Sequence, residues 1–283
     1  MIHNDQADRL RQMVRDRRGG ATVVAVVSGK GGVGKTNVAV NLAVCLAARQ
    51  HRVVLFDADF GLANADLLLG VSVTHTLAHV VSGRCDLDDV IVDAVGGVQF
   101  VPGASGVGQL ANLSEFERRK VLDILGVLDQ RGDILVVDCA AGISRNVTAF
   151  ALAADHILLV TTPEPTALTD AYAVAKTLHR QECSATIAAV VNQAASRTEA
   201  REVHQRLSSV ADKFLGLPVD LGGYILHDEH VPRAVRERAP VVLRYPRCPA
   251  SSCLMAVAGS LARQTGAVGR EESFFRRVVN LFF

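Results

Sequence analysis

Residues 29–36 read Gly29-Lys30-Gly31-Gly32-Val33-Gly34-Lys35-Thr36, which fits the pattern G-x-x-x-x-G-K-[ST]. An apolar run at Val23–Ser28 precedes this loop and a helical pattern at Asn37–Arg49 follows it. The glycines let the backbone curl so that its N–H groups and the helix N-terminus surround phosphate groups and stabilise their charge. Lys35 is placed to reach the β- and γ-phosphates and Thr36 to bind Mg²⁺. The loop therefore predicts a nucleotide site between a strand and a helix, with a plain glycine-rich turn as the alternative.

The rest of the chain predicts an α/β fold around this loop. From Thr22 onward, short runs rich in Val, Ile and Leu alternate with helical patterns, as in a parallel sheet covered on both faces. A doubly wound, mostly parallel sheet with helices on both faces follows, with the ligand at the C-terminal ends of the strands. We expect one domain at residues 21–263, between tails at 1–20 and 264–283. The expected strands are Val23–Ser28, Val53–Asp57, Val98–Pro102, Ile134–Asp138, His156–Thr161, Thr186–Asn192 and Gly223–Leu226.

Composition excludes several classes of protein. The formal net charge is only +1, so no global field would hold the chain on nucleic acid, and we expect no specific nucleic acid partner. The six cysteines show neither disulfide nor zinc spacing, which favours a reducing cytosol. The N-terminus is polar, and no stretch reaches the roughly 18 apolar residues of a membrane span. We expect a cytoplasmic protein.

Acidic residues end two of the predicted strands. Asp57 and Asp59 follow the second strand, and Asp138 ends the apolar run that starts at Ile134. Phosphoryl transfer needs Mg²⁺ held in place and a water molecule aimed at the γ-phosphate, and carboxylates can serve both tasks. The alternative for Asp57 and Asp59 is a solvated pair in a turn.

Lys30, directly after the first glycine, makes the loop resemble the deviant Walker A loop of the MinD/ParA class of ATPases. This resemblance implies that Lys30 reaches the partner's ATP across a homodimer that forms when ATP is bound; a solvated surface lysine is the alternative. It assigns catalytic roles to Asp59, Lys30 and Lys35, with Asp59 orienting water. It assigns Mg²⁺ to Thr36, Asp57 and Asp138.

The same resemblance implies further contacts with ATP or ADP. Asn192, at a strand end, matches the asparagine that reads adenine, although a plain turn residue is the alternative. The segment Gly223–Asp228 resembles the loop that closes over the base, with Leu226 where relatives have proline. The full implied set is Gly29, Lys30, Gly31, Gly32, Val33, Gly34, Lys35, Thr36, Asn37, Asn192, Leu226 and Asp228.

The N-terminal tail narrows the resemblance to the FlhG (FleN) family of flagellar number regulators. Residues 5–11 read D-Q-A-D-R-L-R, which is similar to that family's activator motif D-Q-A-x-x-L-R. Segments Asp59–Asp66 and Thr161–Tyr172 also resemble the family. The resemblance implies stimulation of the SRP-type GTPase FlhF, and further partners among flagellar switch proteins and a flagellar transcription regulator. The implied partner-binding residues are Asp5, Gln6, Ala7, Leu10 and Arg11.

The C-terminal residues predict an amphipathic helix. At 100° per residue, the apolar side chains of residues 274–283 share one arc, with Arg276, Arg277 and Asn280 opposite. Such a helix suits reversible binding to the inner face of the cytoplasmic membrane, and docking on the protein's own core is the alternative. In the family both can hold at different times. The expected membrane contacts are Phe274, Phe275, Val278, Leu281 and Phe282.

Two rival functions remain open at this stage. A MinD-type division-site ATPase would share the core and the terminal helix but lack the motif at residues 5–11. A non-catalytic scaffold would bind ATP with negligible turnover, although the three acids Asp57, Asp59 and Asp138 argue against it.

Overall fold

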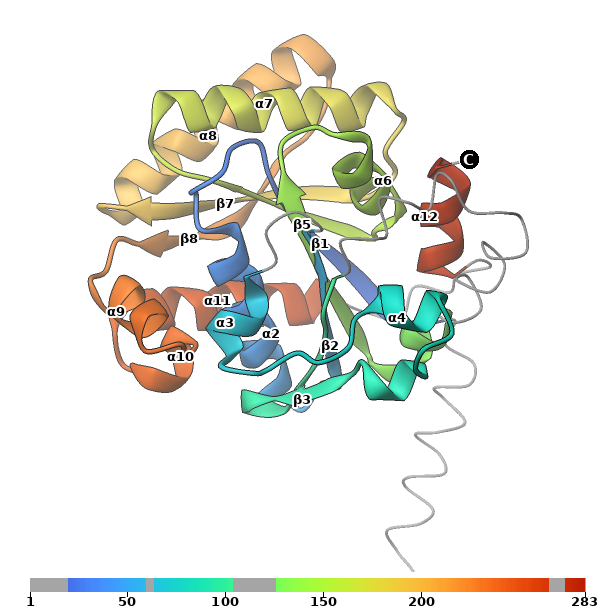
Figure 1. Cartoon of the computed structure of the whole chain (residues 1–283). Coiled ribbons are helices and arrows are strands. Elements are labelled where there is room, and N and C mark those ends of the chain that lie inside the picture. Colours follow the sequence, from blue (N-terminus) through green and yellow to red (C-terminus); the bar gives the residue numbers. More distant parts are fainter. Residues whose placement is uncertain (1–19, 60–63, 104–125, 265–272, 283) are drawn as a thin grey trace, which may run out of the picture.

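An eight-stranded sheet forms the centre of the molecule (Figure 1). The computed structural model describes residues 20–59, 64–103, 126–264 and 273–282. The strand order is β3-β4-β2-β5-β1-β6-β7-β8, and every pair is parallel except β3 with β4. The predicted doubly wound, mostly parallel sheet is confirmed. The strands are β1 (Thr22–Ser28), β2 (Val53–Ala58), β3 (Val92–Ala94), β4 (Val98–Val101), β5 (Ile134–Ala141), β6 (His156–Thr161), β7 (Thr186–Ala194) and β8 (Asp220–Leu226).

The prediction of seven strands missed β3 and shortened three others by two or three residues. β3 is a three-residue edge strand without a buried side chain, so it leaves no apolar run in the sequence. β5 and β7 continue past their predicted ends, and β8 starts three residues earlier than expected. Pairing with the neighbouring strand maintains these extensions, as in Ser28 with Ala141 and Ala188 with Asp220.

Helices cover both faces of the sheet (Figure 1). One face carries α2 (Lys35–Ala47), α3 (Ala65–Leu69), α9 (His230–Arg236), α10 (Val241–Arg244) and α11 (Pro249–Gln264). The other carries α4 (Leu77–Val81), α6 (Arg145–Ala153), α7 (Pro165–Arg180), α8 (Arg197–Leu215) and α12 (Phe274–Phe282). Two short 3₁₀ turns, η1 (Leu87–Asp89) and η2 (Val95–Gly97), flank β3. Each face has its own apolar core, because side chains alternate along every strand.

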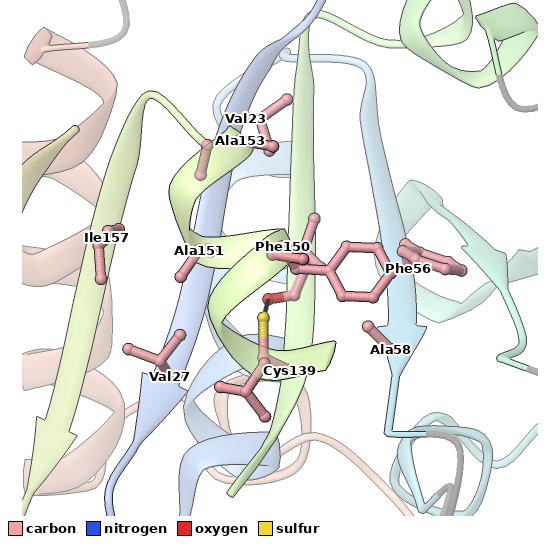
Figure 2. Close-up of a cluster of buried hydrophobic side chains, with 14 of the residues drawn as sticks. Val23, Val27, Phe56, Ala58, Cys139, Phe150, Ala151, Ala153 and Ile157 are labelled. Atoms are coloured by element: carbon pink, nitrogen blue, oxygen red, sulfur yellow. Dashed lines mark hydrogen bonds between the residues drawn. The ribbon is translucent and has the colours of Figure 1, made fainter. Parts of the chain in front are cut away.

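The C-terminal helix α12 is docked on the core. Phe274, Phe275 and Val278 are at most 2% exposed, so these three predicted membrane contacts face protein in this conformation. The ring of Phe275 lies 5.6 Å from that of Phe56 in β2, centroid to centroid. Figure 2 shows Phe150 of α6 beside Phe56 in the same cluster, and their ring centroids are 5.8 Å apart. The docked alternative is therefore the one that the structure shows.

Polar contacts also hold the first half of α12 in place. The N–H of Phe274 donates to the Asp129 carboxylate over 2.7 Å, and the Arg277 guanidinium lies 3.8 Å from the Asp155 carboxylate. Leu281, further along the helix, is 40% exposed. The Phe282 side chain lies outside the described part of the structure.

Several expectations concern residues outside the described ranges. These are the linker at 265–272 and the partner-binding residues Asp5, Gln6, Ala7, Leu10 and Arg11. Among the helices that are described, none combines the length and the apolar character needed to cross a bilayer.

Candidate nucleotide site

The phosphate-binding loop joins β1 to α2 at the C-terminal edge of the sheet. Gly32 and Gly34 have φ values of +82° and +84°, which side-chain-bearing residues rarely adopt. Space is also restricted, because a Cβ on Gly34 would collide with the Asn192 amide and one on Gly29 with the Asp170 carbonyl. The glycines are therefore needed both for the curl of the loop and for its packing.

Lys35 of this loop contacts Asp138 of β5. The Lys35 ammonium forms a buried ion pair with the Asp138 carboxylate, and both side chains are at most 7% exposed. The same ammonium lies 3.3 Å from the Thr36 hydroxyl. The structure thus brings Asp138 of β5 to Lys35 and Thr36 of the loop, as expected for residues predicted to bind phosphate and Mg²⁺.

Asp57 lies directly beside Asp138, because the two residues are register partners on the adjacent strands β2 and β5. One Asp57 oxygen accepts the Asp59 N–H over 3.0 Å. The second oxygen of Asp57 and one oxygen of Asp138 are buried and have no hydrogen-bond partner among the described residues. Asp59 follows at the strand end, half-buried.

The electrostatics of this acidic pair fit a divalent cation. Burial, and then the charge of Asp138, raise the pKa of Asp57 from 3.8 to about 7. Burial also raises the pKa of Asp138, and the Lys35 charge opposes that shift. A hard cation would stabilise the ionised forms and supply the missing partner for both oxygens, so the residues present fit Mg²⁺.

Lys30 is engaged within its own chain. Its ammonium lies 2.7 Å from the Glu164 carboxylate and 3.2 Å from the Thr166 hydroxyl, at the start of α7. The Lys30 and Glu164 side chains are 40% and 63% exposed, and exposed pairs of this kind contribute about 1 kcal/mol or less. Lys30 can therefore exchange this pair for another anion at little cost. Residue pattern alone predicts no role for Glu164 and Thr166; only the family resemblance of the segment Thr161–Tyr172 pointed to this part of the chain.

Asn192 holds the loop from the end of β7. Its side chain is 8% exposed, and its Nδ2 donates to the Val33 carbonyl over 2.8 Å. The predicted contact with adenine stays a prediction, while the contact with the loop is a role that the sequence did not indicate.

Leu226 is the last residue of β8, and Asp228 lies two residues after it. The Asp228 carboxylate accepts the N–H groups of His230 and Ala250 over 3.0 and 3.1 Å. Burial acts to raise the pKa of Asp228, but these hydrogen bonds outweigh it and hold the pKa well below its usual range. Asp228 thus fixes the turn into α9 and the start of α11. Its predicted contact with the base, like that of half-buried Leu226, stays a prediction.

Comparisons with known proteins show which family the chain resembles. Residues 21–187 match the family described as "AAA domain". The chain is 44% identical over 236 residues to "Antiactivator FleN" of Pseudomonas aeruginosa, covering 83% of this chain and 84% of the relative. It is 35% identical to "Flagellum site-determining protein YlxH" of Helicobacter pylori, over 98% of both chains.

Solved structures of MinD have a similar fold. The cell division ATPase MinD of Pyrococcus furiosus superposes with a TM-score of 0.68 at 26% identity, over 86% of this chain and 99% of its own. MinD of Pyrococcus horikoshii, complexed with Mg-ADP, gives a TM-score of 0.68 at 26% identity, over 88% and 100% of the two chains.

Proposed function

Because the chain belongs to the FlhG/FleN family within the MinD/ParA class of P-loop ATPases, we propose that it is a switch that controls flagellar number or placement. ATP binding drives homodimerisation, and hydrolysis to ADP and phosphate returns the chain to a monomer. The observation that carries this proposal is the buried group of Lys35, Asp57 and Asp138 beneath the phosphate-binding loop. The name of the YlxH relative supplies the flagellar role.

The residues of the site divide the chemistry among themselves. Lys35 exchanges its ion pair with Asp138 for the β- and γ-phosphates, so that its charge follows the charge that develops during phosphoryl transfer. Thr36, Asp57 and Asp138 would hold Mg²⁺, which neutralises phosphate charge when bound. Asp59 orients the attacking water at the open end of β2. The loop amides and the start of α2 hold the phosphates themselves.

Lys30 connects this chemistry to dimerisation. In the single chain its charge is satisfied by Glu164 and Thr166, and the exposure of the pair leaves the lysine accessible. When a second chain presents its ATP, Lys30 moves from Glu164 to the partner's phosphates, where the negative charge is greater. The dimer therefore forms only around nucleotide that still carries its γ-phosphate.

The C-terminal helix gives the switch its proposed link to the membrane. In the docked state Phe274, Phe275 and Val278 are buried. Release of α12 would present these residues, with Leu281 and Phe282, to lipid, while Arg276 and Arg277 face anionic headgroups. ATP-driven dimerisation triggers this release at the inner face of the cytoplasmic membrane. The residues at 1–20 stimulate FlhF, and flagellar switch proteins and a transcription regulator receive the output.

The cycle is tested by measuring mass in solution. Asp59→Ala with ATP and Mg²⁺ should form a stable dimer in sedimentation or light scattering, because nucleotide binds but water is no longer oriented. Lys35→Ala should stay monomeric under the same conditions. A persistently monomeric Asp59→Ala chain contradicts the proposal, and phosphate release by the wild type no faster than by Lys35→Ala favours a scaffold without turnover.

Three further measurements test the outputs. The Asp59→Ala dimer should float with vesicles containing anionic lipid, and a chain ending at residue 264 should not. A peptide of residues 1–20 should accelerate GTP hydrolysis by FlhF; no acceleration favours a MinD-type role. Deleting the gene should change the number of flagella per cell.

A further inference from the structure

Three side chains of different chemistry converge where β8 leads into α9 and where α11 begins. Asp228 lies two residues after β8, His230 is the first residue of α9, and Cys248 directly precedes α11. One carboxylate oxygen, one imidazole nitrogen and the sulfur of these residues all lie within 4.8 Å of one another. Carboxylate, imidazole and thiolate are the protein groups that bind Zn²⁺. We call Asp228, His230 and Cys248 the metal-ligand trio.

Hydrogen bonds already connect the members of the trio. One Asp228 oxygen lies 2.7 Å from Nδ1 of His230, and the Cys248 thiol is hydrogen-bonded to the same carboxylate. Each of these contacts holds a proton between two atoms that can also bind a metal ion. Zn²⁺ bonds of about 2.0 Å place tetrahedral oxygen and nitrogen ligands roughly 3.3 Å apart. The carboxylate and the imidazole therefore need to separate by only about 0.6 Å to admit the ion.

A second contact fixes the direction of each side chain in the trio. The other Asp228 oxygen accepts the Ala250 N–H over 3.1 Å, and the Cys248 sulfur accepts a backbone N–H of α11 over 3.4 Å. The His230 ring packs against the Tyr245 ring, with 4.8 Å between their centroids. Ligands that are held in this way lose less freedom when a metal ion binds, so their orientation favours binding.

The burial of the trio also suits a bound cation. The Asp228 side chain is 6% exposed and Cys248 is 7% exposed, so water competes little for these two ligands. The His230 side chain is 46% exposed, so an ion can enter from solvent on the imidazole side. One carboxylate and one thiolate together balance the charge of a divalent ion.

We propose that Asp228, His230 and Cys248 bind Zn²⁺ through one carboxylate oxygen, Nδ1 and the thiolate, with water as the fourth ligand. Binding releases the thiol proton of Cys248 to solvent, and the imidazole keeps its proton on Nε2. Sulfur and imidazole ligands select Zn²⁺ over Mg²⁺, which prefers oxygen ligands throughout.

The trio is separate from the residues that are predicted to hold Mg²⁺. Asp57 and Asp138 lie on β2 and β5, whereas Asp228 follows β8, and β1, β6 and β7 lie between β5 and β8. Four strand spacings of about 4.8 Å place the two sites roughly 19 Å apart across the sheet. The sequence did not indicate this site, because one cysteine far along the chain from Asp228 and His230 shows none of the spacing of paired-cysteine zinc sites.

A bound ion would connect three segments of the fold, namely the end of β8, the start of α9 and the start of α11. The unfolded chain does not hold the three ligands together, so Zn²⁺ binding stabilises the folded chain. Asp228 also belongs to the segment Gly223–Asp228 that is predicted to close over the base, and the ion would restrain this segment. Metal binding itself depends neither on nucleotide nor on turnover.

Cobalt(II) gives the direct test, because a thiolate ligand adds an intense charge-transfer band in the near ultraviolet that oxygen ligands do not give. The reduced full-length chain, with excess Mg²⁺ to occupy the acidic pair, should develop this band and the visible bands of tetrahedral cobalt. Zn²⁺ should displace both. Cys248→Ser should lose the charge-transfer band and weaken Zn²⁺ binding roughly 100-fold, as measured by competition with a chromophoric chelator. His230→Gln should weaken Zn²⁺ binding by a similar factor.

Cys253→Ser on α11 and His227→Gln beside Asp228 are the matched controls, and both should bind Zn²⁺ as the wild type does. Zn²⁺ should raise the melting temperature of the wild type but not that of Cys248→Ser, whose serine preserves the size of the side chain. A charge-transfer band that persists in Cys248→Ser, or an equal loss of affinity in the controls, would overturn the proposal. A wild-type chain that dimerises with ATP but shows no cobalt band would overturn this inference alone. Cys248→Ser that loses Zn²⁺ but still dimerises with ATP would separate the metal site from the proposed function.

Discussion

The two faces of the sheet at the ends of β2 and β5 carry very different residue types. Toward α2 they present Asp57 and Asp138, which meet Lys35 of the phosphate-binding loop. Toward α6 and α12 they present Phe56 and Cys139, which belong to the apolar core. Each residue of one face is the chain neighbour of a residue of the other, because side chains alternate along a strand. The difference lies in what the chemistry permits at each face.

The chemistry of the polar face allows few residue types, whereas the apolar face allows many residue types and more than one kind of partner. Phosphate and Mg²⁺ need an ammonium and carboxylates at fixed points, so the residue types in the sequence predict the site. Apolar packing needs only volume and shape, and lipid or protein can supply it equally well. The sequence therefore leaves two possible partners, lipid or protein, for the apolar arc of Phe274, Phe275 and Val278. The structure shows this arc packed on protein. Changes at the two faces should differ accordingly.

The largest effect is expected on the polar face. Lys35→Ala should lower the rate of ATP hydrolysis about 1000-fold, or roughly 4 kcal/mol, because the charge opposite the phosphates is lost. It also leaves the buried Asp138 without its cation. Phosphate release at saturating ATP measures the effect. Lys213→Ala, on α8, is the matched control and should hydrolyse ATP normally; retention of more than a tenth of the rate by Lys35→Ala would contradict the assignment.

The apolar face should respond in stability. Phe275→Ala removes a fully buried ring from contact with Phe56 and should lower the free energy of unfolding by about 3 kcal/mol. Urea denaturation followed by circular dichroism measures this, since the chain has no tryptophan. Leu281→Ala, on the exposed side of the same helix, should cost under about 1 kcal/mol. Equal, small effects of the two variants would show that α12 is not part of the cooperative fold.

The polar face should make the stability depend on pH between about 4 and 7. The folded chain holds the Asp57 proton more tightly than the unfolded chain, because the pKa of Asp57 is raised from 3.8 to about 7. This contribution is fully present below about pH 4 and is lost as the pH rises toward 7. Denaturation at several pH values in EDTA measures the slope. Asp57→Asn should flatten it, and an unchanged slope would rule out Asp57 as its origin.

The smallest effect concerns the link between β7 and the loop. Asn192→Ala removes the hydrogen bond to Val33 and should weaken ATP binding about 10-fold, or roughly 1.4 kcal/mol. Calorimetric titration of the full chain measures it. Gln193→Asn is the matched control, since asparagine tolerates the positive φ of that position. Unchanged affinity in Asn192→Ala would limit Asn192 to a structural role.

Much of the fold was predictable from the chain. Seven of the eight strands were placed to within a few residues, and six of them are mostly buried apolar runs. β3 leaves none, because an antiparallel edge strand of three residues buries no side chain. The partners of Lys30 could not be found either. Glu164 and Thr166 lie over 130 residues away along the chain, and only the closure of α7 onto the loop brings them together. Phe214 of α8, which is 66% exposed, likewise reads as one more core position on an amphipathic helix.

The sequence by itself determined the phosphate-binding loop, its acids and the parallel sheet, because each rests on residue type and short-range spacing. The tertiary structure decided which apolar helix faces are buried. It buries Phe274 and Phe275 against Phe56 and leaves Phe214 in water, although Phe274, Phe275 and Phe214 all lie on apolar stripes of helices. The physical reason is that burial depends on which surface stands opposite. That surface is set by contacts between segments far apart in the chain.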